Sequence, residues 1–197
     1  MAEQETRVRI TEPHVMRALA HPARIAIVEH LTSTGEAVTA TQCAGLVGLS
    51  PSATSYHLRE LAKVGMVEQA PSRGDGRERL WRSTTSGFSV EGDLGEPETR
   101  RSQQALVDVF LSRDFTRLRE WVARQHEEPE AWQEAATLSN SMLLVTAAEL
   151  TELNVRIQEL IEPYRRRERI TGAPSDARPV AVHYAAFPVE EGLPPQM

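Results

Sequence analysis

The segment Leu49–Gly65, LSPSATSYHLRELAKVG, carries the signals for both ends of a single helix. Ser50 is a favoured N-cap residue, and Pro51 occupies the first helical position, where its missing N–H removes no hydrogen bond. Gly65 supplies the left-handed residue that commonly ends a helix. A helix whose two ends are marked in this way constrains what the neighbouring segments can form.

The two faces of this helix differ in character. Thr54, Leu58 and Leu61 recur at i, i+4 and i+7, which predicts one buried stripe. The other face carries small hydroxyl residues, an aromatic residue, a histidine and an arginine: Ser52, Ala53, Ser55, Tyr56, His57 and Arg59. In the first two turns, such side chains suit a helix whose N-terminal end enters a DNA major groove. An ordinary solvated helix face is the alternative interpretation.

The sequence before this helix predicts three shorter helices. The first begins near Thr11 and is interrupted at His21-Pro22, because the residue before a proline avoids the helical region. The second extends to about Leu31, and the third opens with a capping box at Thr39–Gln42. The short turn between the third and fourth helices is typical of a helix-turn-helix.

A β-hairpin is predicted directly after the fourth helix. Two short strands, Met66–Ala70 and Arg79–Arg82, flank a turn rich in glycine. Arg73 and Arg77 are expected at the hairpin tip and Arg79 at its base, where cations can enter a minor groove or contact phosphate. A solvated turn that carries charge for solubility is the alternative. Helices followed by a hairpin predict a winged helix-turn-helix and a mainly α (α+β) fold class.

Three motifs carry a family resemblance: ALAHPARIAIVEHL, TATQCAGLVGLSPSATSYHLRELAKVGMVEQ and RGDGRERLW. Together they resemble the ArsR-type winged-helix repressors of bacteria over roughly Glu12–Ser83, less than half of the chain. The resemblance implies a cytoplasmic homodimer that binds a palindromic operator and is released by an effector. It also implies base contacts from the residues that follow Ser50, namely Ser52, Ala53, Ser55, Tyr56 and His57. The predicted DNA-contacting set further includes Thr39, Thr41 and Ser50.

The resemblance fails at the positions where metal-sensing members of the family often place two cysteines. Those positions align with Thr39 and Thr41, whose hydroxyls are poor ligands for soft metals. Cys43, the only cysteine, aligns with a core aliphatic residue and is expected to pack in the core. No metal or cofactor is expected, His57 is predicted to contact DNA, and His21 is predicted to be structural. A metal- or redox-responsive sensor that uses Cys43 and histidines is the alternative function.

The second half of the chain is expected to form a dimer. Residues 84–97 are predicted to be a linker. A long helix from Pro97 to about Gln125 then carries an apolar face too broad to remain uncovered. Since the winged domain has its own core, a partner helix is the natural cover. The expected dimer contacts are Met16, Leu19, Leu106, Phe110, Leu111, Phe115, Leu118 and Trp121.

The C-terminal part is predicted to combine a helix with a small strand pair. Ser141–Val145 and Val180–Phe187 are apolar runs expected to pair as strands, in the same chain or across the dimer. Thr146–Glu149 is a second capping box. The predicted domains are a winged helix-turn-helix at 11–83, a linker at 84–97, a helical dimerisation and effector region at 98–188, and a disordered tail at 189–197. The helical region has two interpretations. It binds a small organic ligand near Trp121, Trp132 or Met142, or it serves dimerisation alone.

Charge and composition narrow the class of function. The net charge is −6, but it is +1 over residues 1–90 and −7 over residues 91–197, so the acidic half should face away from phosphate. No apolar run approaches the ~18 residues of a membrane span. The N-terminus lacks a secretory apolar core, and a lone cysteine fits a reducing cytoplasm. Residues 84–197 show no nucleophile motif or phosphate-binding glycine loop, so no enzyme is predicted.

The sequence therefore predicts a cytoplasmic, sequence-specific transcriptional regulator. Its expected form is a dimeric repressor that binds a double-stranded DNA operator and is released by an effector, without a membrane partner.

Overall fold

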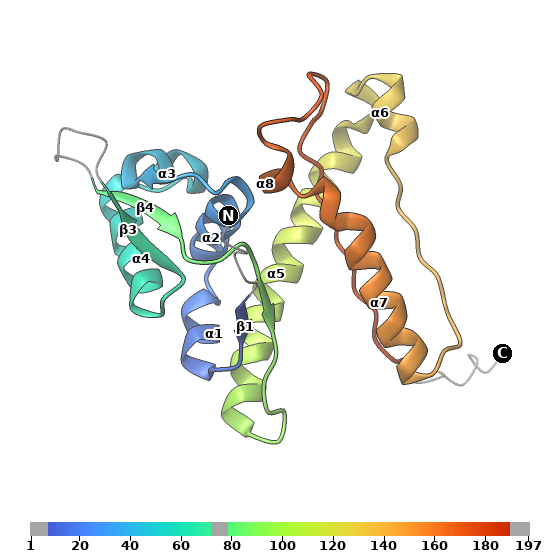
Figure 1. Ribbon diagram of the computed structural model, residues 1–197, viewed down its shortest axis with the longest axis horizontal. Helices are drawn as coiled ribbons and strands as arrows, with labels where there is room; N and C mark the ends of the chain where they lie inside the picture. Colours follow the sequence, from blue (N-terminus) through green and yellow to red (C-terminus); the bar gives the residue numbers. More distant parts are fainter. Residues whose placement is uncertain (1–7, 72–78, 190–197) are drawn as a thin grey trace. The chain divides into compact units, whose positions relative to one another are not determined.

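The computed structural model describes residues 8–71 and 79–189 (Figure 1). Arg73 and Arg77 lie outside the described residues, and so does most of the predicted disordered tail. The chain divides into two compact units, Met1–Gln133 and Glu134–Met197. The helix that begins at Pro97 therefore belongs to the same unit as the winged domain, whereas the sequence pattern separates the two at residues 84–97.

The first unit contains the predicted order of helices followed by the two strands of the hairpin. Its elements in chain order are β1 (Val8–Ile10), α1 (Pro13–Leu19), α2 (Pro22–Thr34), β2 (Val38–Thr39), α3 (Ala40–Val47), α4 (Pro51–Lys63), β3 (Val67–Ala70), β4 (Leu80–Ser83), β5 (Phe88–Val90), α5 (Pro97–Arg124) and the short 3₁₀ helix η1 (Gln125–Glu127), followed by α6 (Glu130–Ala135) at the boundary. This arrangement confirms the mainly α fold class with a winged helix-turn-helix.

Local capping explains where the helices begin and end. His21 is the N-cap of α2, and its Nδ1 accepts a hydrogen bond from the Ala23 N–H at 3.2 Å, which confirms the structural role predicted for His21. The capping box that opens α3 is present, with Thr39 as its N-cap. Gly35 ends α2 at φ 68°. For α1 the N-cap is Glu12, not Thr11, and no side chain caps it.

Two small sheets complete the unit. The wing sheet has the antiparallel order β2-β4-β3, in which Thr39 and Ala70 both lie opposite Leu80. The sequence pattern did not predict β2, because two residues are too short to show an alternation. The second sheet pairs β1 with β5 in parallel, with Val8 opposite Phe88. The predicted linker at 84–97 therefore contains a strand.

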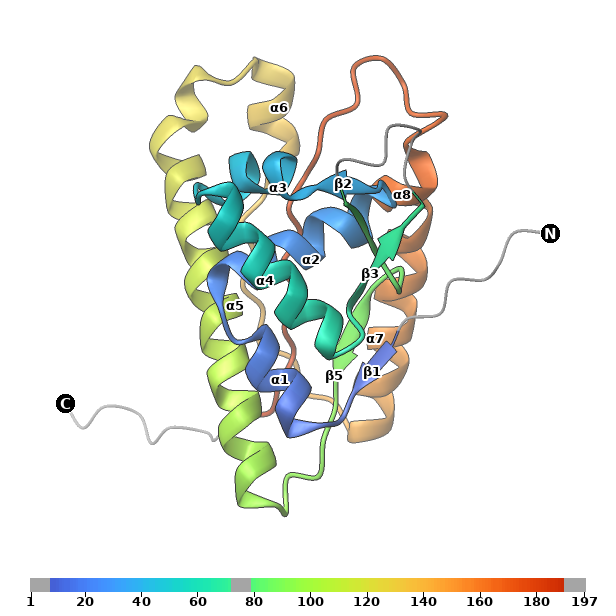
Figure 2. The same cartoon turned by 90° about the vertical axis from the view of Figure 1, so that its left-hand side faces the viewer.

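The core of the unit is formed by α1, α2, α4, the wing sheet and the first half of α5. Its fully buried members include Met16, Leu19, Ile25, Ile27, Val28, Leu31, Leu58, Leu61 and Leu106. The prediction of Met16, Leu19 and Leu106 as dimer contacts is therefore wrong. The reason is that α5 packs along α1, as both views show (Figures 1 and 2), so its first half covers the protein's own core.

Polar contacts also attach α5 to the winged domain. The Glu29 carboxylate of α2 lies 2.5 Å from Arg113 and 3.2 Å from Arg117. Nearer the start of α5, Glu98 pairs with Arg17 of α1 at 2.5 Å. The sequence places these partners more than eighty residues apart, so their pairing was not predictable from local pattern.

The second unit contains α7 (Ala147–Ile161), the 3₁₀ helix η2 (Glu162–Tyr164) and α8 (Arg166–Arg169). The capping box predicted at Thr146 and Glu149 is confirmed. Within one chain the strand pair predicted for 141–145 and 180–187 is wrong, because both runs are irregular and exposed in the structure. An apolar run becomes a strand only when its backbone finds a hydrogen-bonding partner.

In the part of the chain that the structure describes, no helix is long and apolar enough to cross a membrane.

Candidate nucleic-acid interface

The helix α4 is fixed at its N-terminus by the residues that the sequence marked. The Ser50 hydroxyl accepts a hydrogen bond from the Ala53 N–H at 3.2 Å. The buried Thr54 hydroxyl donates to the carbonyl of the exposed Ser50 at 3.0 Å. Gly65 follows the helix at φ 71°. The start of α4 is therefore rigidly placed, which a helix that reads DNA requires.

One face of α4 is buried and the other is open. Thr54, Leu58 and Leu61 are fully buried against the core, as predicted. On the other face Ser52, Tyr56 and Arg59 are exposed, and 49% of Tyr56 remains accessible. Ala53 and Ser55 are half-buried at the edges of this face. Figure 2 shows α4 along the front of the winged domain, with α2 behind it. We call Ser52, Tyr56 and Arg59 the reading face.

His57 does not belong to the reading face, so the prediction that it contacts DNA is corrected. It is 8% exposed, and its ring lies 4.5 Å from the His21 ring, centroid to centroid. Its Nδ1 accepts a weak hydrogen bond from the Arg24 Nε at 3.4 Å. At 100° per residue, position 57 lies between the exposed Tyr56 and the buried Leu58, and α2 covers it.

Arg24 connects this histidine pair to the reading face. Its Nη1 donates to the Ala18 carbonyl at 2.7 Å, and its Cζ lies 6.0 Å from the centre of the Tyr56 ring. Tyr56 also lies edge-on to His57, with ring centroids 5.5 Å apart. The group His21, Arg24, Tyr56 and His57, called here the histidine–arginine cluster, thus supports the exposed tyrosine from behind. The sequence gave no signal for this cluster, since its members come from two helices.

The cluster favours neutral histidines. Burial lowers the pKa of His57, and the neighbouring His21 and Arg24 lower it further, although Glu60 acts in the opposite direction. Burial, followed by Arg24, also lowers the pKa of His21. Both Nδ1 atoms act as hydrogen-bond acceptors here, and a protonated imidazole has no acceptor.

These shifts predict that the winged domain loses stability as the solution is acidified. A histidine whose pKa is lower in the folded than in the unfolded state contributes stability that is present above about pH 6.5 and is lost as the pH falls from there. Urea unfolding at ~pH 7.5 and ~pH 5.5, on either side of the ordinary histidine pKa, should show this loss. His57→Gln keeps an acceptor for Arg24 but cannot be protonated, so its loss should be smaller. His126→Gln, at an exposed position, is the matched control, and an equal loss in all three proteins would contradict the assignment.

The remaining predicted contacts divide between exposed and occupied positions. Thr41 is exposed in the first turn of α3, and Ser50 is exposed at the start of α4. Thr39 is half-buried, and its hydroxyl accepts from the Gln42 N–H at 3.2 Å. Thr39 and Ser50 are the N-caps of α3 and α4, and these two helices pack against each other in the winged domain. Helix N-termini favour phosphate.

The wing contributes cations whose surroundings differ. Arg79 is exposed at the base of the hairpin and has no ion-pair partner among the described residues. Arg59 of the reading face is likewise unpaired within residues 8–71 and 79–189. Arg82, which lies in β4 three residues after Arg79, is paired with Glu68 of β3 at 2.6 Å. Its charge is therefore largely neutralised. Arg59 and Arg79 are therefore the cations best placed for a phosphate.

Cys43 lies in the core, as predicted from its alignment with an aliphatic position. Burial raises the pKa of its thiol to about 11, which keeps it protonated at neutral pH. Reactive and metal-binding cysteines need the thiolate. Within the described ranges, no group of three or more His, Cys, Asp or Glu side chains is arranged to hold a metal ion.

One comparison with known protein families matches the part of the chain that contains α3 and α4. Residues 19–70 match the family model of a helix-turn-helix domain. No curated protein matches the chain. Among solved structures, the chain is similar to a mutant of ZitR from Lactococcus lactis at 15% identity, over 81% of this chain and 82% of that one, with a TM-score of 0.31. It is also similar to apo MarR from E. coli at 14% identity, over 75% and 86% of the two chains, with a TM-score of 0.31.

A third similar structure is the MarR family protein RV2887 of Mycobacterium tuberculosis in complex with salicylic acid. Its identity to this chain is 16%, it covers 75% of this chain and 85% of its own, and the TM-score is 0.30. The match to the helix-turn-helix family covers residues 19–70, and this range contains α3 and α4. The chain carries a helix-turn-helix domain, and this supports a DNA-binding transcriptional regulator.

Proposed function

We propose that the protein is a cytoplasmic, homodimeric, sequence-specific repressor of the ArsR type, which binds a double-stranded operator and leaves it when an effector binds. In this proposal the reading face of each protomer enters a major groove. Ser52 and Tyr56 contact base edges or thymine methyl groups, and Arg59 and Arg79 contact phosphates. Two reading helices then meet successive major grooves about 34 Å apart. No reaction is assigned to the protein.

The observation that carries the proposal is the contrast between the two faces of α4. The helix is held by a buried stripe, a capped start and the histidine–arginine cluster, yet its first three turns expose an aromatic residue and an arginine. The Tyr56 ring contacts Arg24 and His57 on one side, while about half of the residue remains accessible to a ligand. Rigid groups on a helix suit the direct reading of bases.

The dimer is proposed from the second apolar face of α5. The face that packs on α1 includes Leu106 and Phe110. A different side of the helix carries a second apolar stripe: Val107, Leu111, Phe115, Leu118 and Val122. Phe115 is 55% exposed and Val122 is 44% exposed. A stripe of this kind on a long helix supports association with a second copy.

The base-reading role of Tyr56 gives a direct test. Tyr56→Ala should lose about 1–3 kcal/mol of discrimination at one base pair of each half-site, while binding to unrelated duplex stays unchanged. Selection of bound fragments from the genomic neighbourhood, followed by titration of single base-pair changes in the selected operator, measures this loss. Tyr164→Ala removes another exposed tyrosine, 70% accessible on η2, and should leave the preference unchanged.

Tyr56→Phe separates the two parts of the side chain, because it keeps the ring contacts with Arg24 and His57 and removes only the hydroxyl. Thermal unfolding of each variant checks that the winged domain is intact. An unchanged sequence preference in an intact Tyr56→Ala protein would show that the reading face lies elsewhere.

A further inference from the structure

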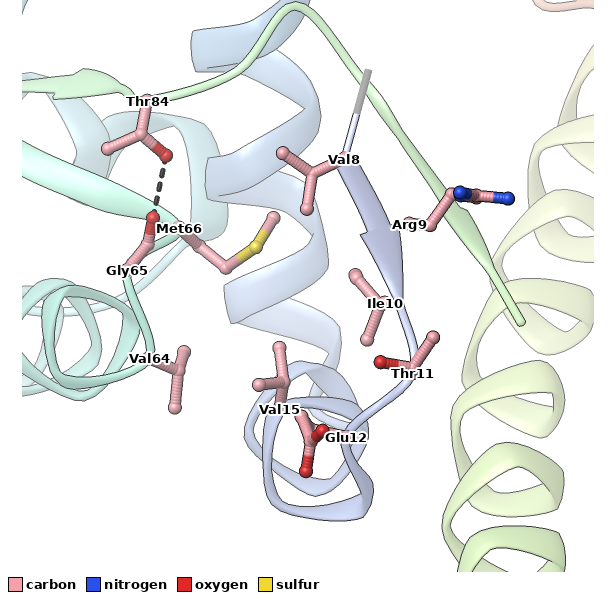
Figure 3. A pocket seen from close by; sticks show the side chains of 10 residues that line it. All are labelled: Val8, Arg9, Ile10, Thr11, Glu12, Val15, Val64, Gly65, Met66 and Thr84. Atoms are coloured by element: carbon pink, nitrogen blue, oxygen red, sulfur yellow. Dashed lines mark hydrogen bonds between the residues drawn. The ribbon is translucent and has the colours of Figure 1, made fainter. Parts of the chain in front are cut away.

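A pocket of about 210 Å³ lies in the first unit, beside the C-terminal end of α4 (Figure 3). It is bounded by β1, by the start of α1, by the turn that follows α4, and by Thr84 after β4. None of the residues predicted to contact DNA or a second protomer lines it. The residues near which the sequence analysis considers an effector, Trp121, Trp132 and Met142, do not line it either.

The pocket is apolar with one free carboxylate. Figure 3 shows the side chains of Val8, Ile10, Val15, Val64 and Met66 bordering a common space. Val8 is 42% exposed, so the space is open to solvent on that side.

The charged side chains at the pocket behave differently. Arg9 points away from the common space and pairs with Glu91 at 3.6 Å. Glu12 carries its carboxylate at the end near Val15, where no described residue donates a hydrogen bond or ion pair to it. Among the described residues, the pocket therefore presents an apolar wall and one carboxylate without an ion-pair partner, that of Glu12.

We infer that this pocket binds a small apolar amine, with the hydrocarbon body against the valine and methionine side chains and the ammonium group at Glu12. The volume of the pocket limits the size of the ligand, because an engineered apolar cavity of about 150 Å³ holds one benzene ring. A volume of 210 Å³ accommodates a ring with a short substituent. The sign of the only unpaired charge favours a cation over a carboxylate ligand.

The occupant would contact the segment that ends the reading helix. Val64 and Gly65 directly follow α4, and the Met66 N–H donates to the Leu61 carbonyl at 3.0 Å. The Thr84 hydroxyl donates to the Gly65 carbonyl at 2.6 Å and so joins this turn to the end of β4. A ligand seated against Val64 and Met66 therefore biases the direction of α4. This effector role rests on the proposed function, whereas the binding site itself does not.

The binding experiment uses the full chain without DNA, so it is independent of operator recognition. 2-Phenylethylamine is titrated against protein with labelled methyl groups, and 3-phenylpropanoate serves as the anion of similar size. The amine should produce saturable shifts at the methyl groups of Val15, Val64 and Met66, with a Kd of about 1 mM or tighter. The anion should bind at least about threefold more weakly. Absence of saturable shifts, or equal binding of both molecules, would overturn the inference.

Two pairs of variants locate the site. Val8→Phe fills the open side of the pocket at an exposed strand position, where an aromatic residue is well tolerated, and should abolish the shifts. Val8→Thr preserves the shape and should retain them. Glu12→Gln removes the charge and should weaken amine binding about three- to fivefold, since an exposed ion pair contributes little more. Glu36→Gln, at an exposed carboxylate elsewhere, should bind as the native protein does.

Operator affinity measured with and without the amine then tests the regulatory half. A changed affinity in the native protein that disappears in Val8→Phe supports a link between pocket and α4. Saturable binding with unchanged operator affinity would retain the site and overturn its effector role. Failure to bind any duplex would refute the proposed function while leaving the methyl shifts as they are.

Discussion

A Phe115→Arg protein is expected to sediment as a monomer and to bind its operator at least about 100-fold more weakly than the native protein. Two linked reading helices make the second half-site contact intramolecular, and losing that linkage removes about 10²–10⁴-fold in affinity. Phe115 lies near the middle of the second apolar stripe of α5 and is 55% exposed. An arginine at this position would place an unpaired charge inside a helix–helix contact, which is strongly unfavourable.

The control for this variant is Thr116→Arg. Thr116 is exposed on the next position of α5, about 100° round the helix and away from the stripe. It adds the same charge without entering the proposed contact, so it should remain dimeric. Sedimentation velocity at micromolar concentration and operator titration are measured on both proteins. A Phe115→Arg protein that stays dimeric, or a native protein that is already monomeric, would exclude the α5 stripe as the dimer contact.

The winged half of the fold was predictable because its signals are local. The capping box at Thr39, the Ser50-Pro51 start and the glycine at 65 each determine a few neighbouring hydrogen bonds, and the structure contains all of them. The buried stripe of α4 was predictable for the same reason. Local patterns did not predict the β1–β5 pair or β2, since these depend on segments distant in sequence.

The predictions that the structure contradicts depend on which neighbour covers a given side chain. Leu106 and Phe115 are both apolar and both lie on α5. Leu106 is fully buried where α5 packs along α1, whereas Phe115 is exposed. The sequence shows that both are apolar but does not show which neighbour each one meets. His57 was misplaced for a similar reason, because its burial depends on His21 and Arg24 from another helix. Ser141–Val145 has no partner strand among the described residues of the chain.

The predicted DNA contacts of Ser52, Tyr56, Arg59 and Arg79 remain predictions at exposed positions, and those of Ala53 and Ser55 remain predictions at half-buried ones. Geometry adds a ranking to them. Tyr56 and Arg59 are the long exposed side chains of the reading face, whereas Ala53 and Ser55 are half-buried at its edges.

Adjacent residues of α4 allow folding and recognition to be separated. Leu58 is fully buried, and Arg59 beside it is exposed. Leu58→Ala is expected to lower the free energy of unfolding of the winged domain by about 2–5 kcal/mol, because it removes buried methyl groups and leaves a cavity. That loss is a large share of the roughly 5–15 kcal/mol that stabilises an ordinary domain. Operator binding should fall with it and recover at lower temperature or with excess operator, since the reading face itself is intact.

Arg59→Ala should show the reverse pattern, with stability within about 0.5 kcal/mol of native, as is usual for surface positions. Its affinity should fall for every duplex, and its salt dependence should become shallower by about one phosphate contact. Urea unfolding followed by the fluorescence of Trp81, with Trp121 and Trp132 replaced by Phe, reports on the winged domain alone, because Trp81 lies in its core. If Leu58→Ala left stability unchanged, α4 would not be held by its buried stripe. If Arg59→Ala bound all duplexes as tightly as the native protein does, that arginine would not face phosphate, and the orientation proposed for α4 on DNA would have to change.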